Sequence, residues 1–253
     1  MYNRLATILI MFLAAFSFIV VAATDPQGPS TLRVNWSQRN TPYDPLNLSA
    51  LAGNITELEI FAKTQTRTWQ GYVGNISGTI TLDDGGNWTL YDWSNTEPRG
   101  QIYATPTAVV PTWANVNCFE YYVDGTSRYN LTEIESNLGL DSTEKDGVNE
   151  TFQYKTHPLI YVGSKVIENQ TCWNTNLYRN DAFQSNYFFE LLLTDNTTNS
   201  IIYTAIIENK TPGALGDVAG YNGIQYDFQM LVGENGHGTD IATTPYWFYV
   251  ELI

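Results

Sequence analysis

Basic residues are scarce in this chain of 253 residues, which has 12 Lys and Arg against 26 Asp and Glu. The formal net charge is -14 at pH 7, and the sequence contains no run rich in Lys or Arg. Because binding to a phosphate backbone relies on clustered positive charge, nucleic acid is not an expected partner. An anionic membrane surface would repel the chain as well.

Histidine is nearly absent, since His157 and His237 are the only two. The sequence also lacks the G-x-S-x-G, H-E-x-x-H, P-loop and G-x-G-x-x-G signatures. A nucleophile activated by His would need one particular His to be catalytic. We therefore do not expect an enzyme.

Paired carboxylates are the remaining catalytic option, because a glycoside hydrolase needs only two Asp or Glu facing each other across a cleft. Glu57 and Glu59 share the polar side of a predicted strand, and Asp83 and Asp84 share a predicted turn. Both pairs are expected to be solvated.

Acidic loops offer only weak candidates for a calcium site. With Gly147 at position 6 of an EF-hand loop, position 1 falls on Ser142 and position 12 on Gln153, where carboxylates are required. No cofactor is therefore expected, and irregular binding of Ca2+ is a weak alternative. Its candidate ligands are Asp141, Glu144, Asp146, Glu234 and Asp240.

A long apolar run occurs at the start of the chain. Residues 5–23 carry no charge and follow Arg4, and the sequence becomes polar from Thr24. This pattern is typical of an export signal, and cleavage before Thr24 would leave residues 24–253. The run is also long enough to cross a bilayer, so residues 1–23 are either a signal peptide or an N-terminal anchor. We expect the rest of the chain to be extracellular or at the cell surface.

Only two cysteines are present, Cys118 and Cys172, and neither belongs to a C-x-x-C pair. Since an exported chain meets an oxidising compartment, the sequence predicts one disulfide between them. Closing a loop of this length would stabilise the fold by about 4 kcal/mol in the chain-entropy model.

Alternation of apolar and polar residues is the dominant pattern and predicts half-buried antiparallel strands. The clearest examples are residues 31–37, 57–63 and 224–232. Clusters of Asp, Asn and Gly predict hairpin turns at residues 82–87 and 194–200. The predicted fold is therefore all-β, an antiparallel β-sandwich.

Helix is scarce, and the best candidate is a short insertion at residues 132–139, where Thr132 and Glu135 have capping-box spacing. One extended domain is expected, with a division near Thr112 into two stacked β-units, 31–112 and 113–253, as the alternative. The apolar run at residues 245–253 is interpreted as an interior strand, or alternatively as a strand exchanged with a neighbouring subunit.

Asn-x-Ser/Thr triplets are more than twice as frequent as the roughly four expected by chance. They indicate N-glycosylation, although Asn and Thr are also common on the surface of β-proteins. The ten asparagines concerned are Asn35, Asn47, Asn54, Asn75, Asn87, Asn130, Asn149, Asn169, Asn196 and Asn209.

Aromatic residues gather in and around residues 68–93. They form either a platform that stacks against sugars or a set of cross-strand pairs that only stabilise a sheet, and neighbouring triplets favour the second interpretation. The residues concerned are Trp69, Tyr72, Trp88, Tyr91 and Trp93.

The strings "WQGYVGNISGTITLDD", "LYDW", "PRGQIYA" and "DFQMLVGENGHGTD" carry a resemblance to a family. Together they look like segments shared by exported archaeal surface proteins of unassigned function. The resemblance implies secretion or surface attachment, with archaeal N-glycosylation at the triplets, and brings no catalytic residue and no ligand.

These observations favour a glycosylated structural or adhesion protein, such as a filament or envelope subunit. Its expected partners are other envelope proteins or further copies of the chain. The alternative is a carbohydrate-binding module that takes glycans, followed by a secreted glycoside hydrolase.

Overall fold

The structure is a computed structural model that describes residues 24–41, 43–95, 98–122, 130–141, 143–208, 218–236 and 243–253. All strand pairs are antiparallel, and the fold is all-β with a sandwich-like arrangement, as predicted. The predicted signal or anchor at residues 1–23 lies outside the described residues. None of the helices in the described ranges is long and apolar enough to cross a bilayer.

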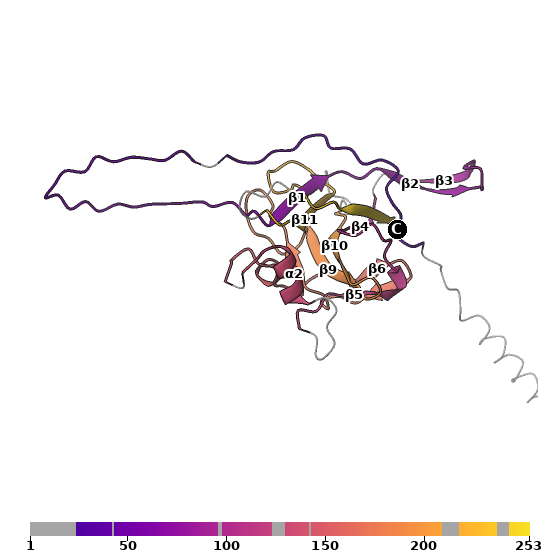
Figure 1. Ribbon diagram of the computed structural model, residues 1–253. Helices are drawn as coiled ribbons and strands as arrows, with labels where there is room; N and C mark the ends of the chain where they lie inside the picture. The colour runs from indigo at the N-terminus through magenta and orange to yellow at the C-terminus, as the bar shows by residue number, and fades with distance from the viewer. Residues whose placement is uncertain are drawn as a thin grey trace, which may run out of the picture.

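A six-stranded sheet forms the centre of the molecule (Figure 1). Its order is β12-β4-β10-β9-β5, and β8 pairs with β9 on the same side as β5. The strands are β4 (Gly100–Thr105), β5 (Val116–Cys118), β8 (Asn174–Asn176), β9 (Phe189–Asp195), β10 (Ser200–Ile206) and β12 (Trp247–Leu252).

Both faces of this sheet are buried, which explains why β9 and β10 read as continuous apolar runs. In β10, Ile201 and Tyr203 lie in one core, whereas Ile202 lies in the core on the opposite face. The first core is covered by β1 (Trp69–Gly74), β11 (Phe228–Gly233), α2 (Leu131–Asn137) and α3 (Val148–Thr151). The second is covered by β6 (Ile160–Val162), β7 (Lys165–Ile167) and the 3-10 turn η1 (Trp113–Asn115).

The two predicted hairpins are confirmed. β2 (Gly78–Asp83) and β3 (Thr89–Asn95) form one, and β9 and β10 form the other. Asn87 and Asn199 adopt the positive φ angles of 62° and 53° that such turns need. Asp84 fixes the first turn, because its side chain accepts hydrogen bonds from the backbone N–H groups of Gly86 and Trp88.

The predicted helix is confirmed as α2, but its capping box lies two residues earlier than expected. The side chain of Asn130 accepts a hydrogen bond from the N–H of Glu133, whose carboxylate accepts one from the N–H of Asn130. Thr132 is therefore inside the helix rather than at its cap. Gly139, with φ of 68°, follows the helix as predicted.

The prediction of strands at residues 31–37 and 57–63 is wrong. The chain is extended there, but the structure assigns no strand and every described residue from 28 to 67 is exposed. Alternation gives a segment an apolar side, whereas a strand also requires a neighbour to pair its N–H and C=O groups. We call residues 28–67 the arm; it projects from the body as two extended limbs (Figure 1).

Two further boundaries differ from the sequence interpretation. The strand expected at residues 224–232 begins only at Phe228, and the side chain of Ile224 is 57% exposed. The C-terminal strand β12 is an edge strand rather than an interior one, because among the described residues it pairs with β4 on one side and only with Gln27 on the other. β4 lies between β12 and β10, so a division at Thr112 would cut through this sheet.

Candidate interaction surface

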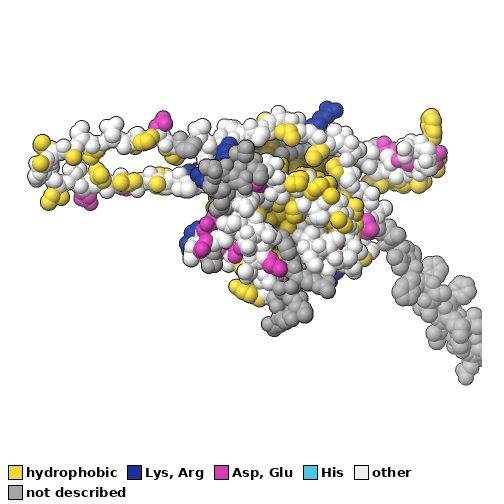
Figure 2. Space-filling model, in the orientation of Figure 1, with side chains coloured by type: hydrophobic (Ala, Val, Ile, Leu, Met, Phe, Trp, Pro, Cys, Tyr) yellow, Lys and Arg dark blue, Asp and Glu magenta, His cyan; other side chains and the backbone are white. Residues whose placement is uncertain are grey.

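The arm exposes a large amount of apolar surface (Figure 2). Burying one large apolar side chain stabilises a protein by about 1.5–3 kcal/mol, so an uncovered row of them is unusual on a stable protein. Eleven such side chains lie on the arm: Leu32, Val34, Trp36, Tyr43, Leu46, Leu48, Leu51, Ile55, Leu58, Ile60 and Phe61.

The β2–β3 hairpin forms a second exposed apolar surface, on the opposite side of the body from the arm (Figures 1 and 2). Leu82 pairs with Tyr91, and Ile80 pairs with Trp93, so these four side chains share one face of the hairpin. The rings of Tyr91 and Trp93 meet edge to face with centroids 4.8 Å apart. Trp88, beside the turn, is 78% exposed.

The structure divides the predicted stacking platform between two places. Trp88 and Trp93 lie on the projecting hairpin, whereas Trp69 and Tyr72 pack against the first core. Trp69 contacts Phe152 and Tyr203, with ring centroids 5.7 and 6.3 Å away. The aromatic residues around residues 68–93 thus include both core residues and exposed rings.

Two sheet edges lie beside the first core, the β1 edge of the covering sheet and the β12 edge of the central sheet. β1 pairs only with β11, and no described strand lies on its other side. At the β12 edge, Val250 exchanges two backbone hydrogen bonds with Gln27, at 2.7 and 3.0 Å. Pro26 and Pro29 flank Gln27 and have no N–H group to extend this pairing.

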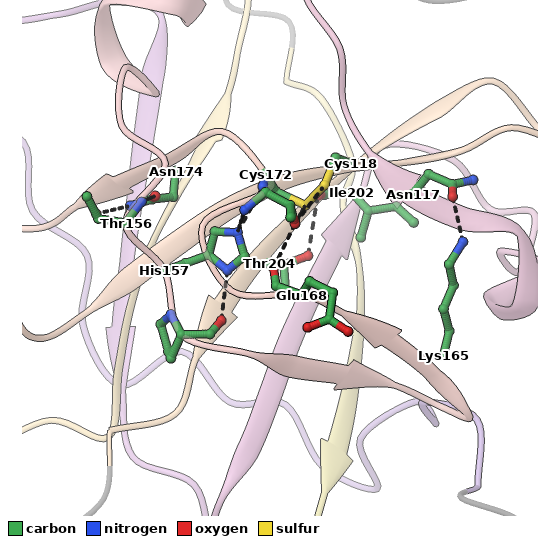
Figure 3. Close-up of a disulfide and its surroundings, with 12 residues drawn as sticks. Asn117, Cys118, Thr156, His157, Lys165, Glu168, Cys172, Asn174, Ile202 and Thr204 are labelled. Atoms are coloured by element: carbon green, nitrogen blue, oxygen red, sulfur yellow. Dashed lines mark hydrogen bonds between the residues drawn. A yellow bond between two sulfur atoms is a disulfide. The ribbon is translucent and has the colours of Figure 1, made fainter.

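The disulfide between Cys118 and Cys172 is present as predicted, with the Cα atoms 4.9 Å apart (Figure 3). It joins β5 to the segment before β8. His157 lies beside it and is fully buried. Its Nε2 accepts hydrogen bonds from the backbone N–H groups of Thr171 and Cys172, and its Nδ1 donates to the carbonyl of Pro158.

This arrangement gives His157 a structural role. Accepting two N–H groups requires an unprotonated Nε2, and burial lowers the pKa of the imidazole below its usual 6.5. A neutral, fully engaged ring has no exposed nitrogen for catalysis. His237 lies outside the described residues.

Buried carboxyl groups are the polar feature that the sequence interpretation missed. Burial raises the pKa of Glu190 well above its usual range, although the N–H of Leu231 donates to its Oε2. Burial likewise raises the pKa of Glu251, which accepts hydrogen bonds from Tyr103 and from the N–H of Gly163. The signal in the sequence is a lone Glu within each of the apolar runs "FFELLL" and "FYVELI".

These buried acids hold the layers together. Glu190 lies on β9 and reaches the backbone of β11 in the covering sheet, while Glu251 on β12 reaches the turn between β6 and β7. They lie on different faces of the central sheet, because their strand neighbours Leu192 and Tyr249 belong to different cores. They are therefore not a catalytic pair.

The carboxylate pairs considered for hydrolysis are both exposed. Glu57 and Glu59 lie on the arm, and Asp84 is occupied by the hairpin turn, while Asp83 accepts a hydrogen bond from Thr81. The structure places neither pair in a cleft between strands.

Among the described residues, no three His, Cys, Asp or Glu side chains are grouped so as to hold a metal ion. Asp141 accepts two hydrogen bonds from Thr143, and Asp146 accepts one from Thr66. The backbone N–H of Glu144 donates to the carbonyl of Asp141 in a turn, and the backbone N–H of Glu234 donates to the carbonyl of Thr68 beside β1. Asp240 lies outside the described residues.

The asparagines of the triplets are accessible wherever the structure describes them. Asn130 and Asn149 are half-buried and the remainder are exposed, whereas Asn174 and Asn176, which belong to no triplet, are buried. Asn209 lies outside the described ranges. The exposed ones are Asn35, Asn47, Asn54, Asn75, Asn87, Asn169 and Asn196.

Comparison with known proteins yields no relative to guide the assignment. The resemblance to exported archaeal surface proteins therefore stays a prediction. The chain matches no protein-family model, no curated protein and no solved structure.

Proposed function

We propose that this protein is an exported, glycosylated structural β-protein that acts outside the cell by associating with further copies or with other envelope proteins. The observation that carries the proposal is the arm, where every described residue is exposed and eleven large apolar side chains lie uncovered. Covering all eleven would contribute about 16–33 kcal/mol, which exceeds the whole stability of a domain, about 5–15 kcal/mol. A role in which a partner covers the arm makes use of this surface.

Two further features support this role. The accessible triplets fit a surface that carries sugar, which keeps exposed faces soluble until they are paired. The disulfide fits an oxidising location such as the cell surface. A filament or envelope subunit combines all these properties, and adhesion is a variant of the same role.

The test is the state of the protein recovered from its own host. We expect it in the cell-surface fraction, in complexes or polymers that survive native extraction, and with an intact mass above that of the polypeptide by the mass of the glycans. Recovery as an unmodified cytosolic monomer would contradict the proposal.

A second candidate, carbohydrate binding, rests on the exposed rings of Trp88, Tyr91 and Trp93 on the hairpin. Flat rings in water offer the apolar faces on which sugars stack. Titration with soluble glycans should then change Trp fluorescence, and Trp93→Ala should reduce the response more than Trp36→Ala on the arm. An unchanged spectrum with every glycan class would remove this candidate.

A further inference from the structure

Among the described residues the covering sheet ends at β1, whose outer backbone groups have no strand partner. Glu234 donates its N–H to the carbonyl of Thr68, which points toward β11. Backbone groups alternate in direction along a strand, so those of Gln70 and Tyr72 also point toward β11. Trp69, Gly71 and Val73 consequently direct their N–H and C=O groups outward. The side chain of Gln70 donates to the outward carbonyl of Gly71, at 2.7 Å.

We propose that residues 31–37 of a second copy of this chain occupy this edge and add a third strand beside β1. The inference rests on the proposed function and names the contact through which copies associate. Partly buried apolar side chains of β12, namely Phe248, Val250 and Leu252, pack against the same core as β1. Tyr72 of β1 meets Phe248 edge to face, with centroids 5.4 Å apart.

Residues 31–37 have the pattern that such a position requires. Leu32, Val34 and Trp36 alternate with polar residues, and their exposed fractions are 67, 82 and 54%. In an added strand these three side chains would face the core while the others face water. The triplet at Asn35 would then lie on the water side, where a glycan is compatible with pairing.

The other limb of the arm is less suited to this edge. In residues 57–63, Phe61 lies on the side opposite to Leu58 and Ile60, so an added strand would leave an aromatic ring uncovered. Glu57 and Glu59 on that opposite side would also bring negative charge to an already acidic protein.

The charge of the limb that contains residues 31–37 also favours this limb as the added strand. Residues 26–43 contain Arg33 and Arg39 and no acidic residue, although the whole chain has a net charge of -14. The basic limb of one copy thus meets a strongly acidic second copy, which favours encounter between copies.

Residues 31–37 do not extend the pairing that Gln27 makes with β12 of the same chain. Gln27 lies opposite Val250 in antiparallel register, so continued pairing would place residue 31 opposite Tyr246, before β12 begins. Pro29 also interrupts that ladder. The chain therefore pairs with its own β12 at one point and then extends away from the body.

The test compares Val34→Asp with Asn35→Asp in unglycosylated protein spanning residues 24–253. Both variants add one negative charge at neighbouring exposed positions, and neither changes a buried residue, so both should unfold at the same urea concentration as the wild type. Burying an unpaired charge costs several kcal/mol, so Val34→Asp should raise the concentration at half association by at least about a hundredfold. Asn35→Asp should leave it within about threefold of the wild-type value.

Hydrogen exchange locates the contact. The amides of Gly71 and Val73 should exchange slowly in associated wild-type protein and rapidly in Val34→Asp at the same concentration. If copies associate but Val34→Asp behaves as Asn35→Asp does, or if both amides exchange rapidly, the contact is wrong while self-association stands. Protection that does not depend on concentration would mean that the arm pairs within its own chain and would overturn the proposal. Wild-type protein that stays monomeric at every concentration would remove self-association together with the contact.

Discussion

Glu208 makes a contribution to the pH dependence of stability that can be predicted from its surroundings. It follows β10, and its Oε1 accepts a hydrogen bond from the N–H of Phe188, at 2.5 Å. Burial raises the pKa of Glu208 from 4.5 to about 7, and the hydrogen bond and the charge of Arg179 oppose this effect only in part. The group therefore keeps its proton in the folded state at pH values where the unfolded chain has lost it.

The sign and size follow from this difference. Below pH 4.5 the carboxyl group is protonated in both states, and its contribution to stability is fully present. Between pH 4.5 and about 7 only the unfolded state releases the proton, so the free energy of unfolding falls as pH rises. The interval corresponds to a loss of about 3 kcal/mol.

Glu208→Gln removes this titration and keeps an oxygen that can accept the hydrogen bond from Phe188. Urea unfolding at pH 4.5 and pH 8 should show that the variant loses about 3 kcal/mol less than the wild type across this range. Glu120→Gln, at an exposed position, controls for the loss of one negative charge. Parallel pH profiles for wild type and Glu208→Gln would refute the reasoning.

Three other measurements follow from the structure. Replacing Cys118 and Cys172 by Ser should lower the free energy of unfolding by about 4 kcal/mol, measured in urea without reductant. Burial lowers the pKa of His157 in the folded state, so as pH falls below 6.5 the unfolded chain binds a proton that the folded chain does not, and the wild type loses stability. His157→Gln should not show this loss between pH 7 and pH 5. Asn130→Ala should cost about 1 kcal/mol through the lost helix cap, whereas Thr132→Ala, which removes the same triplet, should cost less in unglycosylated protein; equal losses would contradict the cap.

Local patterns in the sequence predicted the local structure well. The hairpin turns at Asp84 and Asp195 follow from Asp, Asn and Gly residues that bond within a few positions of themselves, so no distant neighbour is needed. The single pair of cysteines left one possible disulfide, and the structure contains it. Helix α2 was predicted for similar reasons. Its start was placed at Thr132 instead of Asn130, because Thr132 and Glu135 have the same capping-box spacing as Asn130 and Glu133.

Patterns that depend on a neighbour were less informative. Val34 and Ile60 lie in segments where apolar and polar residues mostly alternate, but alternation does not show whether a partner strand is present in the same chain. The same limit applies to the rings: Trp69 and Trp93 look equivalent in sequence, yet one packs on the core and the other is in water. The burial of Glu190 depends on β11, which lies about forty residues further along the chain.

The position of the disulfide has a mechanical consequence. A pull applied to the two ends of the chain passes directly from Cys118 to Cys172 through the sulfur atoms, so the segment between them carries no tension. That segment contains α2, α3, β6 and β7. About 180 Å of extended chain is thereby withheld when the molecule is stretched, and the elements it places on both faces of the central sheet are not pulled open directly.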